Sequence, residues 1–158
     1  MQRVVTGRYF EQFAVGEVVT HAITRTVSEA DNVLFTCLTM NSQPMHLDVE
    51  FAAEHEFGRP LVNSLFTLGL IVGIAVPELT HGTTIANLGF GEITFPAPVF
   101  AGDTIWVETE VTDKRISKSR TDSGIVTLEH RGYNQRDELI CKANRAALMR
   151  LAPGPRDS

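Results

Sequence analysis

The most hydrophobic stretch of the sequence is Leu65-Phe66-Thr67-Leu68-Gly69-Leu70-Ile71-Val72-Gly73-Ile74-Ala75-Val76. Its apolar residues cover every side of a helix, which is typical of a helix buried within a protein, and it is too short to cross a bilayer. Asn63 or Ser64 can cap its first turn, and Pro77 is expected to end it. The sequence therefore predicts a central helix over 65–76 that is covered on nearly every side.

The segments on either side of this helix have the pattern of strands. The hydrophobic period becomes two after the helix, which predicts four strands over 83–95, 104–116, 124–133 and 138–150. Residues 134–137 supply a hairpin turn, and residues 18–27 are expected to form a first strand. A sheet wrapped around one buried helix accounts for this order. We therefore predict an α+β fold in a single domain over 1–152, followed by a disordered tail over 153–158.

Two short helices are predicted before the central one. A serine at 28 and an aspartate at 31 form a capping-box pattern for a helix over 28–38, and Asp48 can cap a second helix over 48–55. One face of the first helix is apolar and consists of Val33, Leu34, Cys37 and Leu38.

A polar elbow, Thr39-Met40-Asn41-Ser42-Gln43-Pro44-Met45-His46-Leu47-Asp48, separates these two helices. Pro44 prevents one continuous helix because it lacks an amide hydrogen and restricts the residue before it. Asn41 and His46 are therefore expected to lie on an ordered elbow with side chains that point into a cleft. The alternative is that His46 only caps or braces the second helix.

Composition excludes several classes of protein. The chain of 158 residues has a formal net charge of −5 and a pI near 5.5, which argues against nucleic acid as the main partner. Cys37 and Cys141 have apolar neighbours and no CxxC partner, so we expect buried, reduced thiols in a cytoplasmic protein. Neither a signal peptide nor a membrane-spanning run is recognisable, and no membrane partner is expected.

Signals for a metal or a nucleotide cofactor are absent from the sequence. The histidines at 21, 55, 81 and 130 are scattered without ligand spacing, so no catalytic metal is predicted. The segment Gly89-Phe90-Gly91 lacks the spacing of a dinucleotide-binding or Walker loop.

Three segments in the right order resemble the MaoC-like dehydratases, the hot-dog-fold group that includes the (R)-specific enoyl-CoA hydratases. They are the elbow, Phe57-Gly58-Arg59-Pro60 before the central helix, and Phe95-Pro96-Ala97-Pro98-Val99-Phe100-Ala101-Gly102-Asp103 before a long strand. The resemblance covers roughly residues 9–149. It implies a hot-dog fold, an acyl-CoA substrate that brings its own CoA, no separate cofactor, and a homodimer or higher homo-oligomer.

The resemblance also implies roles for three residues. His46 matches the histidine and Asn41 the aspartate that together hold a water molecule in the family, and Ser64 matches the position whose backbone amide polarises the thioester carbonyl. Asn41 departs from the family pattern, as does Asn63-Ser64, where His-Gly is usual. A carboxamide can orient water but cannot transfer a proton near neutral pH.

The asparagine leaves several interpretations open. The protein is a hydratase in which His46 performs both proton transfers, or Asn41 is an adaptation to a branched dicarboxylyl-CoA such as mesaconyl- or itaconyl-CoA, whose carboxylate an aspartate would repel. A third interpretation is a catalytically silent acyl-CoA-binding or regulatory module. A thioesterase is disfavoured because it usually needs an acidic residue on the central helix, and 65–76 contains none.

Five residues are candidates for substrate binding: Asn63, Arg59, Gln43, Lys118 and Arg120. Lys118 and Arg120 belong to the densest cluster of positive charge, which could bind the CoA phosphates or form a solvated strand end. Arg59 lies beside the elbow, where the alternative is a contact with a helix C-terminus. Asn63 and Ser64 would add hydrogen-bond donors for the carboxylate of a dicarboxylyl group.

Overall fold

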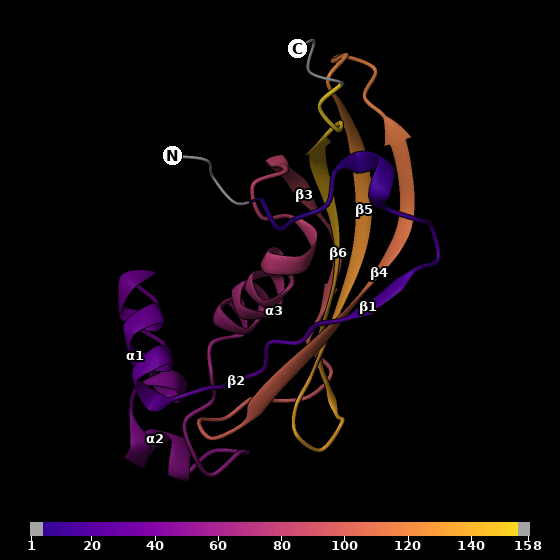
Figure 1. Ribbon diagram of the computed structural model, residues 1–158. Helices are drawn as coiled ribbons and strands as arrows, with labels where there is room; N and C mark the ends of the chain where they lie inside the picture. The colour runs from indigo at the N-terminus through magenta and orange to yellow at the C-terminus, as the bar shows by residue number, and fades with distance from the viewer. Residues whose placement is uncertain (1–4, 155–158) are drawn as a thin grey trace.

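The computed structural model describes residues 5–154 and shows a curved antiparallel sheet with one long helix, α3 (Ser64–Leu79), against one face (Figure 1). The strand order is β1-β4-β5-β6-β3, and β2 also pairs with β4. The strands are β1 (Val18–Thr20), β2 (Arg25–Thr26), β3 (Thr84–Thr94), β4 (Thr104–Ile116), β5 (Ser123–Tyr133) and β6 (Leu139–Arg150). This is the α+β hot-dog fold expected from the sequence. Of the tail predicted to be disordered over 153–158, residues 155–158 lie outside the described residues.

The core forms between α3 and the inner face of the sheet. Ile71 and Ile74 of α3 pack with inward-facing residues such as Val107 and Ile140, while Ala75 and Leu79 belong to a second buried cluster further along the sheet. On β4, buried and partly exposed residues alternate, which confirms the predicted period of two. The sheet thus fixes α3 along its whole length.

The shorter helices precede α3 and lie at one end of the molecule, apart from η1 (Phe10–Gln12). They are α1 (Glu29–Leu38), η2 (Pro44–His46) and α2 (Val49–Ala53). The predicted capping box is present, because the Ser28 hydroxyl accepts from the Asp31 N–H and the Asp31 carboxylate accepts from the Ser28 N–H. Asp48 caps α2 as expected, although that helix ends earlier than predicted.

The prediction that Pro77 ends the central helix is wrong. A proline removes one backbone donor, but the next residues can still close the last turn, and the Thr80 N–H donates to the Val76 carbonyl at 3.0 Å. Glu78 is held by the His21 imidazole and by the Ala22 N–H, which stabilises this turn from outside the helix. The longer helix therefore contains an acid, but at its carboxyl end and already bound, which does not favour the thioesterase interpretation.

The strand predicted over 18–27 is instead two short strands, β1 and β2. At the break, the His21 side chain turns under α3 and its ring bonds to Glu78 and Thr109. The Ala22 N–H donates to Glu78 rather than to a neighbouring strand. The His21 N–H still donates to the Val107 carbonyl at 2.9 Å, so the backbone pairing with β4 extends to the break and resumes at β2.

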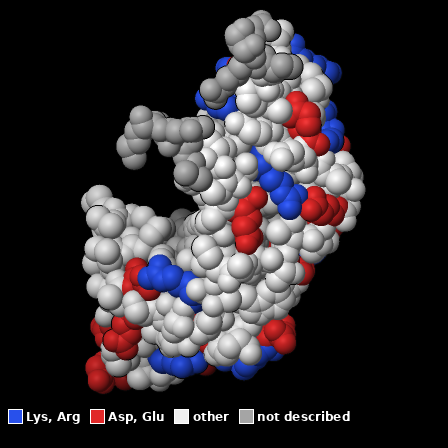
Figure 2. Space-filling view, in the orientation of Figure 1, with Lys and Arg blue, Asp and Glu red and all other residues white. Residues whose placement is uncertain are grey.

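The burial of α1 runs against its hydrophobic pattern. Its buried residues are Asn32 and Thr36, whereas Leu34 and Leu38 are 61% and 74% exposed. Cys37 is also exposed, so the prediction of two buried thiols holds only for Cys141. Much of the exposed surface of α1 is therefore uncharged. Figure 2 shows a hollow between this helix and the part of the molecule that contains the sheet.

The central helix is not covered on every side either. Leu65, Gly69 and Gly73 lie on one stripe of α3 and are exposed in the single chain. The expectation of burial all round is therefore wrong for one chain alone, and an apolar stripe on α3 adds to the apolar face of α1.

Met40 is a specific point of backbone strain at the end of α1. Its φ angle is 55°, in the left-handed region, and its side chain is 90% exposed. We expect Met40→Gly to raise the free energy of unfolding by about 0.5–1 kcal/mol, because glycine removes the Cβ penalty and no packing is lost. Urea denaturation measures this change. Met40→Ala is the control, since it keeps the Cβ atom and should be neutral; a Met40→Gly protein less stable than Met40→Ala would contradict the assignment.

Candidate active site

His46 lies at the end of η2, where Pro44 starts a short turn that the elbow sequence predicted. Its ring Nδ1 is 2.7 Å from the Leu61 carbonyl oxygen. A carbonyl can only accept, so Nδ1 carries the hydrogen and, in the neutral ring, Nε2 keeps a lone pair. The bond is to the segment before α3 rather than to α2, so His46 does not cap the second helix. Its geometry suits a general base that is held from behind.

The amino end of α3 offers a free backbone donor. Asn63 is the cap residue, and its Oδ1 accepts from the Leu65 N–H at 3.0 Å. No described residue accepts from the Ser64 N–H. Ser64 is exposed and lines a cavity of about 340 Å³ together with Leu61 and Thr67. A free N–H at the positive end of a long helix can stabilise negative charge that develops on a carbonyl oxygen.

The base and the helix end are joined through one short segment. The Leu61 N–H donates to the Met45 carbonyl and the Leu61 carbonyl accepts from His46, while Asn63 two residues later caps α3. The elbow and the entry to the helix are thus hydrogen-bonded to each other. A displacement of either would displace the other.

Asn41 does not share a cavity with His46 in the single chain. Its Oδ1 accepts from the Gln43 N–H at 3.0 Å, which is the closed turn that asparagine often makes two residues ahead. It lines a cavity with Cys37 and Leu47, whereas His46 lines a different one of about 230 Å³. The expectation that both side chains point into one cleft is therefore not met by one chain, because Asn41 stabilises the elbow.

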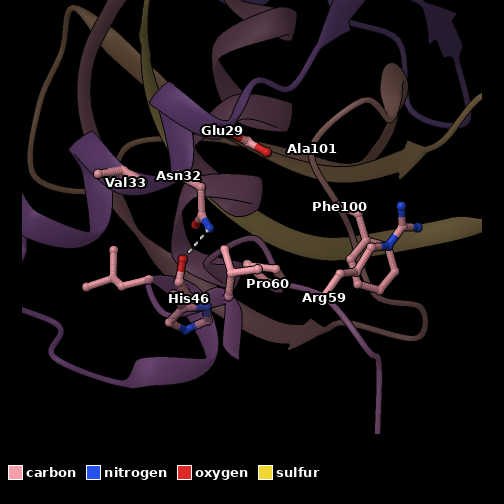
Figure 3. A pocket seen from close by; sticks show the side chains of 10 residues that line it. Glu29, Asn32, Val33, His46, Arg59, Pro60, Phe100 and Ala101 are labelled. Atoms are coloured by element: carbon pink, nitrogen blue, oxygen red, sulfur yellow. Dashed lines mark hydrogen bonds between the residues drawn. The ribbon is translucent and has the colours of Figure 1, made fainter. Parts of the chain in front are cut away.

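Two of the predicted substrate-binding residues lie beside the elbow. Gln43 and Arg59 line one cavity of about 320 Å³, and Arg59 also lines the cavity of His46. The Arg59 guanidinium carbon lies 3.9 Å from the centre of the Phe100 ring (Figure 3). Among residues 5–154, no carboxylate pairs with Arg59. Its charge is therefore free for an anionic ligand.

The other three predicted substrate-binding residues do not line a cavity beside the elbow. Asn63 is buried, its Oδ1 accepts from the Leu65 N–H and its Nδ2 faces the Thr36 hydroxyl at 3.5 Å, so in the single chain its carboxamide is not placed to donate to a substrate. Lys118 and Arg120 lie in the turn between β4 and β5, at the opposite end of the sheet from the elbow (Figure 1). Arg120 is paired there with Asp122 at 2.9 Å.

Asn32 and Thr36 are site residues that the sequence reasoning missed. Both are buried, and the Asn32 carboxamide donates to the His46 carbonyl at 3.0 Å (Figure 3). Their spacing of four residues places them on one face of α1. Two polar residues on one face of a helix whose start is fixed by a capping box were the available signal.

Within residues 5–154, no three His, Cys, Asp or Glu side chains gather as a metal site would require. No helix in the same range is both long enough and apolar enough to cross a membrane.

The protein has a hot-dog fold, and the elbow that carries His46 is hydrogen-bonded to the segment that leads into the central helix. The chain belongs to the MaoC-like domain family, whose model matches residues 10–134. It is similar to a mesaconyl-CoA hydratase of Cereibacter sphaeroides, with 33% identity over 94% of this chain and 44% of that protein. It is also similar to an (R)-specific enoyl-CoA hydratase of Aeromonas caviae, with 33% identity over 72% of this chain and 79% of that protein.

A solved structure shows the same likeness over a whole chain. The monoamine oxidase regulatory protein of Archaeoglobus fulgidus superposes with a TM-score of 0.83 and 34% identity, covering 95% of this chain and 100% of that one. By contrast, the chain spans less than half the length of the mesaconyl-CoA hydratase.

Proposed function

We propose that this protein adds water reversibly across the 2,3 double bond of an enoyl-CoA thioester. The observation that carries the proposal is the His46 imidazole, whose Nδ1–H is held by the Leu61 carbonyl so that Nε2 is left as the basic atom. The free Ser64 N–H at the start of α3 supplies the second function that this reaction needs. The named hydratases among the relatives support the same reaction.

His46 and Ser64 line different cavities of the single chain, and Leu61, which lines the Ser64 cavity, bonds to the His46 ring between them, so the proposed thioester lies across both. His46 Nε2 takes a proton from water while the water oxygen bonds to C3, and the electron pair of the double bond moves toward the thioester carbonyl. The negative charge on that oxygen is stabilised by the Ser64 N–H and the helix end. The proton then passes from His46 to C2, which completes the addition of one water. CoA arrives with the substrate, and no separate cofactor is required.

We further propose that the acyl group is a branched dicarboxylate such as mesaconyl or itaconyl. A neutral Asn41 on the elbow does not repel a second carboxylate, and the unpaired Arg59 guanidinium lines the His46 cavity and can attract one. The relative named as a mesaconyl-CoA hydratase supports this choice.

A panel of crotonyl-, mesaconyl- and itaconyl-CoA tests both proposals through loss of the conjugated thioester absorbance. Turnover of any member supports a hydratase, and a higher kcat/KM for a dicarboxylyl-CoA supports the substrate class. If crotonyl-CoA has the higher value by a large factor, the dicarboxylate proposal fails.

Asn41→Asp refines this comparison. A carboxylate at position 41 would repel a second negative charge on the acyl group. At a separation of about 6 Å and an effective dielectric constant of about 20, that repulsion is worth about 2–3 kcal/mol. We expect the ratio of kcat/KM for mesaconyl-CoA over crotonyl-CoA to fall by about 30- to 150-fold. Gln43→Glu is the control for charge at the same elbow, and an equal fall in both variants would show a general field rather than an effect at Asn41.

The second candidate is a silent acyl-CoA-binding or regulatory module. It is favoured by the Asn41 carboxamide, which is occupied by the Gln43 N–H and lines a cavity away from His46. Calorimetric binding of an acyl-CoA without turnover of any member of the panel, in both the native protein and Asn41→Asp, is the result expected of such a module.

We also propose a homodimer or higher homo-oligomer in the cytoplasm. The apolar face of α1 and the apolar stripe of α3 are uncovered in the single chain. A second copy would cover them, and two copies approach the length of the mesaconyl-CoA hydratase.

A further inference from the structure

The carboxamide of Asn32 is almost fully enclosed, with 4% of the residue exposed, and it bonds to three separate backbone groups. Its Nδ2 donates to the His46 carbonyl at 3.0 Å and to the Leu61 carbonyl at 3.2 Å. Its Oδ1 accepts from the Asn63 N–H at 2.9 Å. Both hydrogens and one lone pair of the carboxamide are therefore used by the two segments that form the candidate site.

These contacts bear directly on the orientation of the base. The Leu61 oxygen accepts from both Asn32 Nδ2 and His46 Nδ1, so its two lone pairs are filled and its direction is fixed. Asn32 also holds the peptide unit on the other side of the His46 ring, through the His46 carbonyl. Asn32 thus holds His46 in two ways: directly at the His46 carbonyl, and at ring Nδ1 through the Leu61 carbonyl.

The same side chain also controls the entry to α3. Asn63 immediately precedes Ser64, whose N–H is the proposed donor to the thioester oxygen. The bond from the Asn63 N–H to Asn32 fixes the peptide that leads into the helix. One carboxamide therefore sets the position of the base and of the oxyanion donor relative to each other.

Few other side chains could do this at the same position. Leucine has a similar volume but would remove the bonds to the His46 carbonyl and the Asn63 N–H and one of the two bonds to the Leu61 carbonyl, and each buried group left without a partner costs about 1–3 kcal/mol. Aspartate could still accept from Asn63 but would place a carboxylate against two carbonyl oxygens. A carboxamide has two donors and an acceptor in one plane, which matches the three groups.

We propose that Asn32 is a positioning residue that fixes the Nδ1–H tautomer of His46 and aligns Nε2 with the Ser64 N–H; this rests on the proposed hydratase function. Asn32→Leu should lower kcat by about 10²-fold, since a misplacement of about 1 Å has an effect of this size. Asn32 lines the His46 cavity, but its carboxamide is already bonded to three backbone groups and has no free donor for the substrate, so KM should change by less than about threefold.

The matched control is Asn134→Leu. Asn134 is also a buried asparagine whose carboxamide makes several short bonds, but these lie in the turn between β5 and β6, with Arg136 and Glu138. Asn134→Leu, like Asn32→Leu, should unfold at a lower temperature than the native protein. Unlike Asn32→Leu, it should retain the native kcat per folded protein. Equal losses of kcat in both variants would show a merely structural role for Asn32 and overturn the proposal.

A second measurement does not depend on turnover. Long-range ¹H–¹⁵N spectra of the histidine rings should show His46 as the Nδ1–H tautomer in the native protein and as a mixture of tautomers in Asn32→Leu. An unchanged tautomer in the variant overturns the proposal. If the tautomer shifts but the native protein hydrates no member of the panel, the positioning role stands and the proposed function fails.

Discussion

Replacing His46 with alanine is expected to lower kcat/KM for the preferred enoyl-CoA by about 10²- to 10⁴-fold. The reason is that Nε2 is the only basic atom that we place on the reacting water, while Asn41 is neutral and already bonded to the Gln43 N–H. The absorbance assay measures the loss, with circular dichroism used to compare folded protein. The fall should appear mainly in kcat, since proton transfer is lost rather than thioester binding.

A second histidine provides the control for this substitution. His81 is exposed and lies beyond the carboxyl end of α3, far along the helix from Ser64. His81→Ala should keep full activity. Hydration that persists at the native rate in His46→Ala would remove the base from the mechanism and leave the silent-module proposal as the better one.

The second large effect is a loss of stability in mild acid caused by His130. This residue lies fully buried on β5, and its Nδ1 is 2.8 Å from the Thr109 hydroxyl. Burial, together with the charges of Arg145 and His21, lowers the pKa of His130 to about 3. An unfolded histidine has a pKa of about 6.5, so between these values the unfolded chain binds a proton that the folded protein does not.

The direction in which the unfolding free energy changes with pH follows from that difference in bound protons. Stability is complete above about pH 6.5 and falls as the pH is lowered toward 3, and His130 alone should remove about 2 kcal/mol of unfolding free energy between pH 7.5 and 5.0. Urea unfolding at the two pH values measures this. Burial raises the pKa of Glu78, but the hydrogen bonds from His21 and Ala22 lower it by more, so the pKa lies below its ordinary value. Glu78 therefore loses its stabilising charge only in stronger acid.

The comparison with His130→Gln isolates the histidine. Glutamine cannot titrate, so the change in unfolding free energy between pH 7.5 and 5.0 should shrink by about 2 kcal/mol, whatever the absolute stability of the variant. The same change in both proteins would mean that His130 is protonated in the folded state.

The parts of the fold that could be predicted were those set by local chemistry. The period of two on β4, the capping box at Ser28 and Asp31, and the proline turn before His46 each depend on neighbours in sequence, and the structure shows all three. The cap of α3 by Asn63 was one of the two options. Such signals need no knowledge of what lies across the core.

The features that the sequence did not predict involve groups whose partners are distant in sequence. Glu78 on the last turn of α3, beyond Pro77, is in contact with His21 at the break between β1 and β2, and the two residues are 57 residues apart. The burial of Asn32 depends on carbonyls that arrive from the elbow and from Leu61. An apolar pattern shows which face of a helix avoids water, but not whether that face meets its own chain.

The two thiols of this chain differ in a way that is useful to an experimenter. Burial raises the pKa of Cys141 to about 12, while Cys37 is exposed on the last turn of α1 and lines the same cavity as Asn41. A maleimide dye should therefore react at Cys37 in the single chain and not at Cys141. Because Cys37 lies on the apolar face of α1, its protection from the dye in the native protein would report directly that a second copy covers this face.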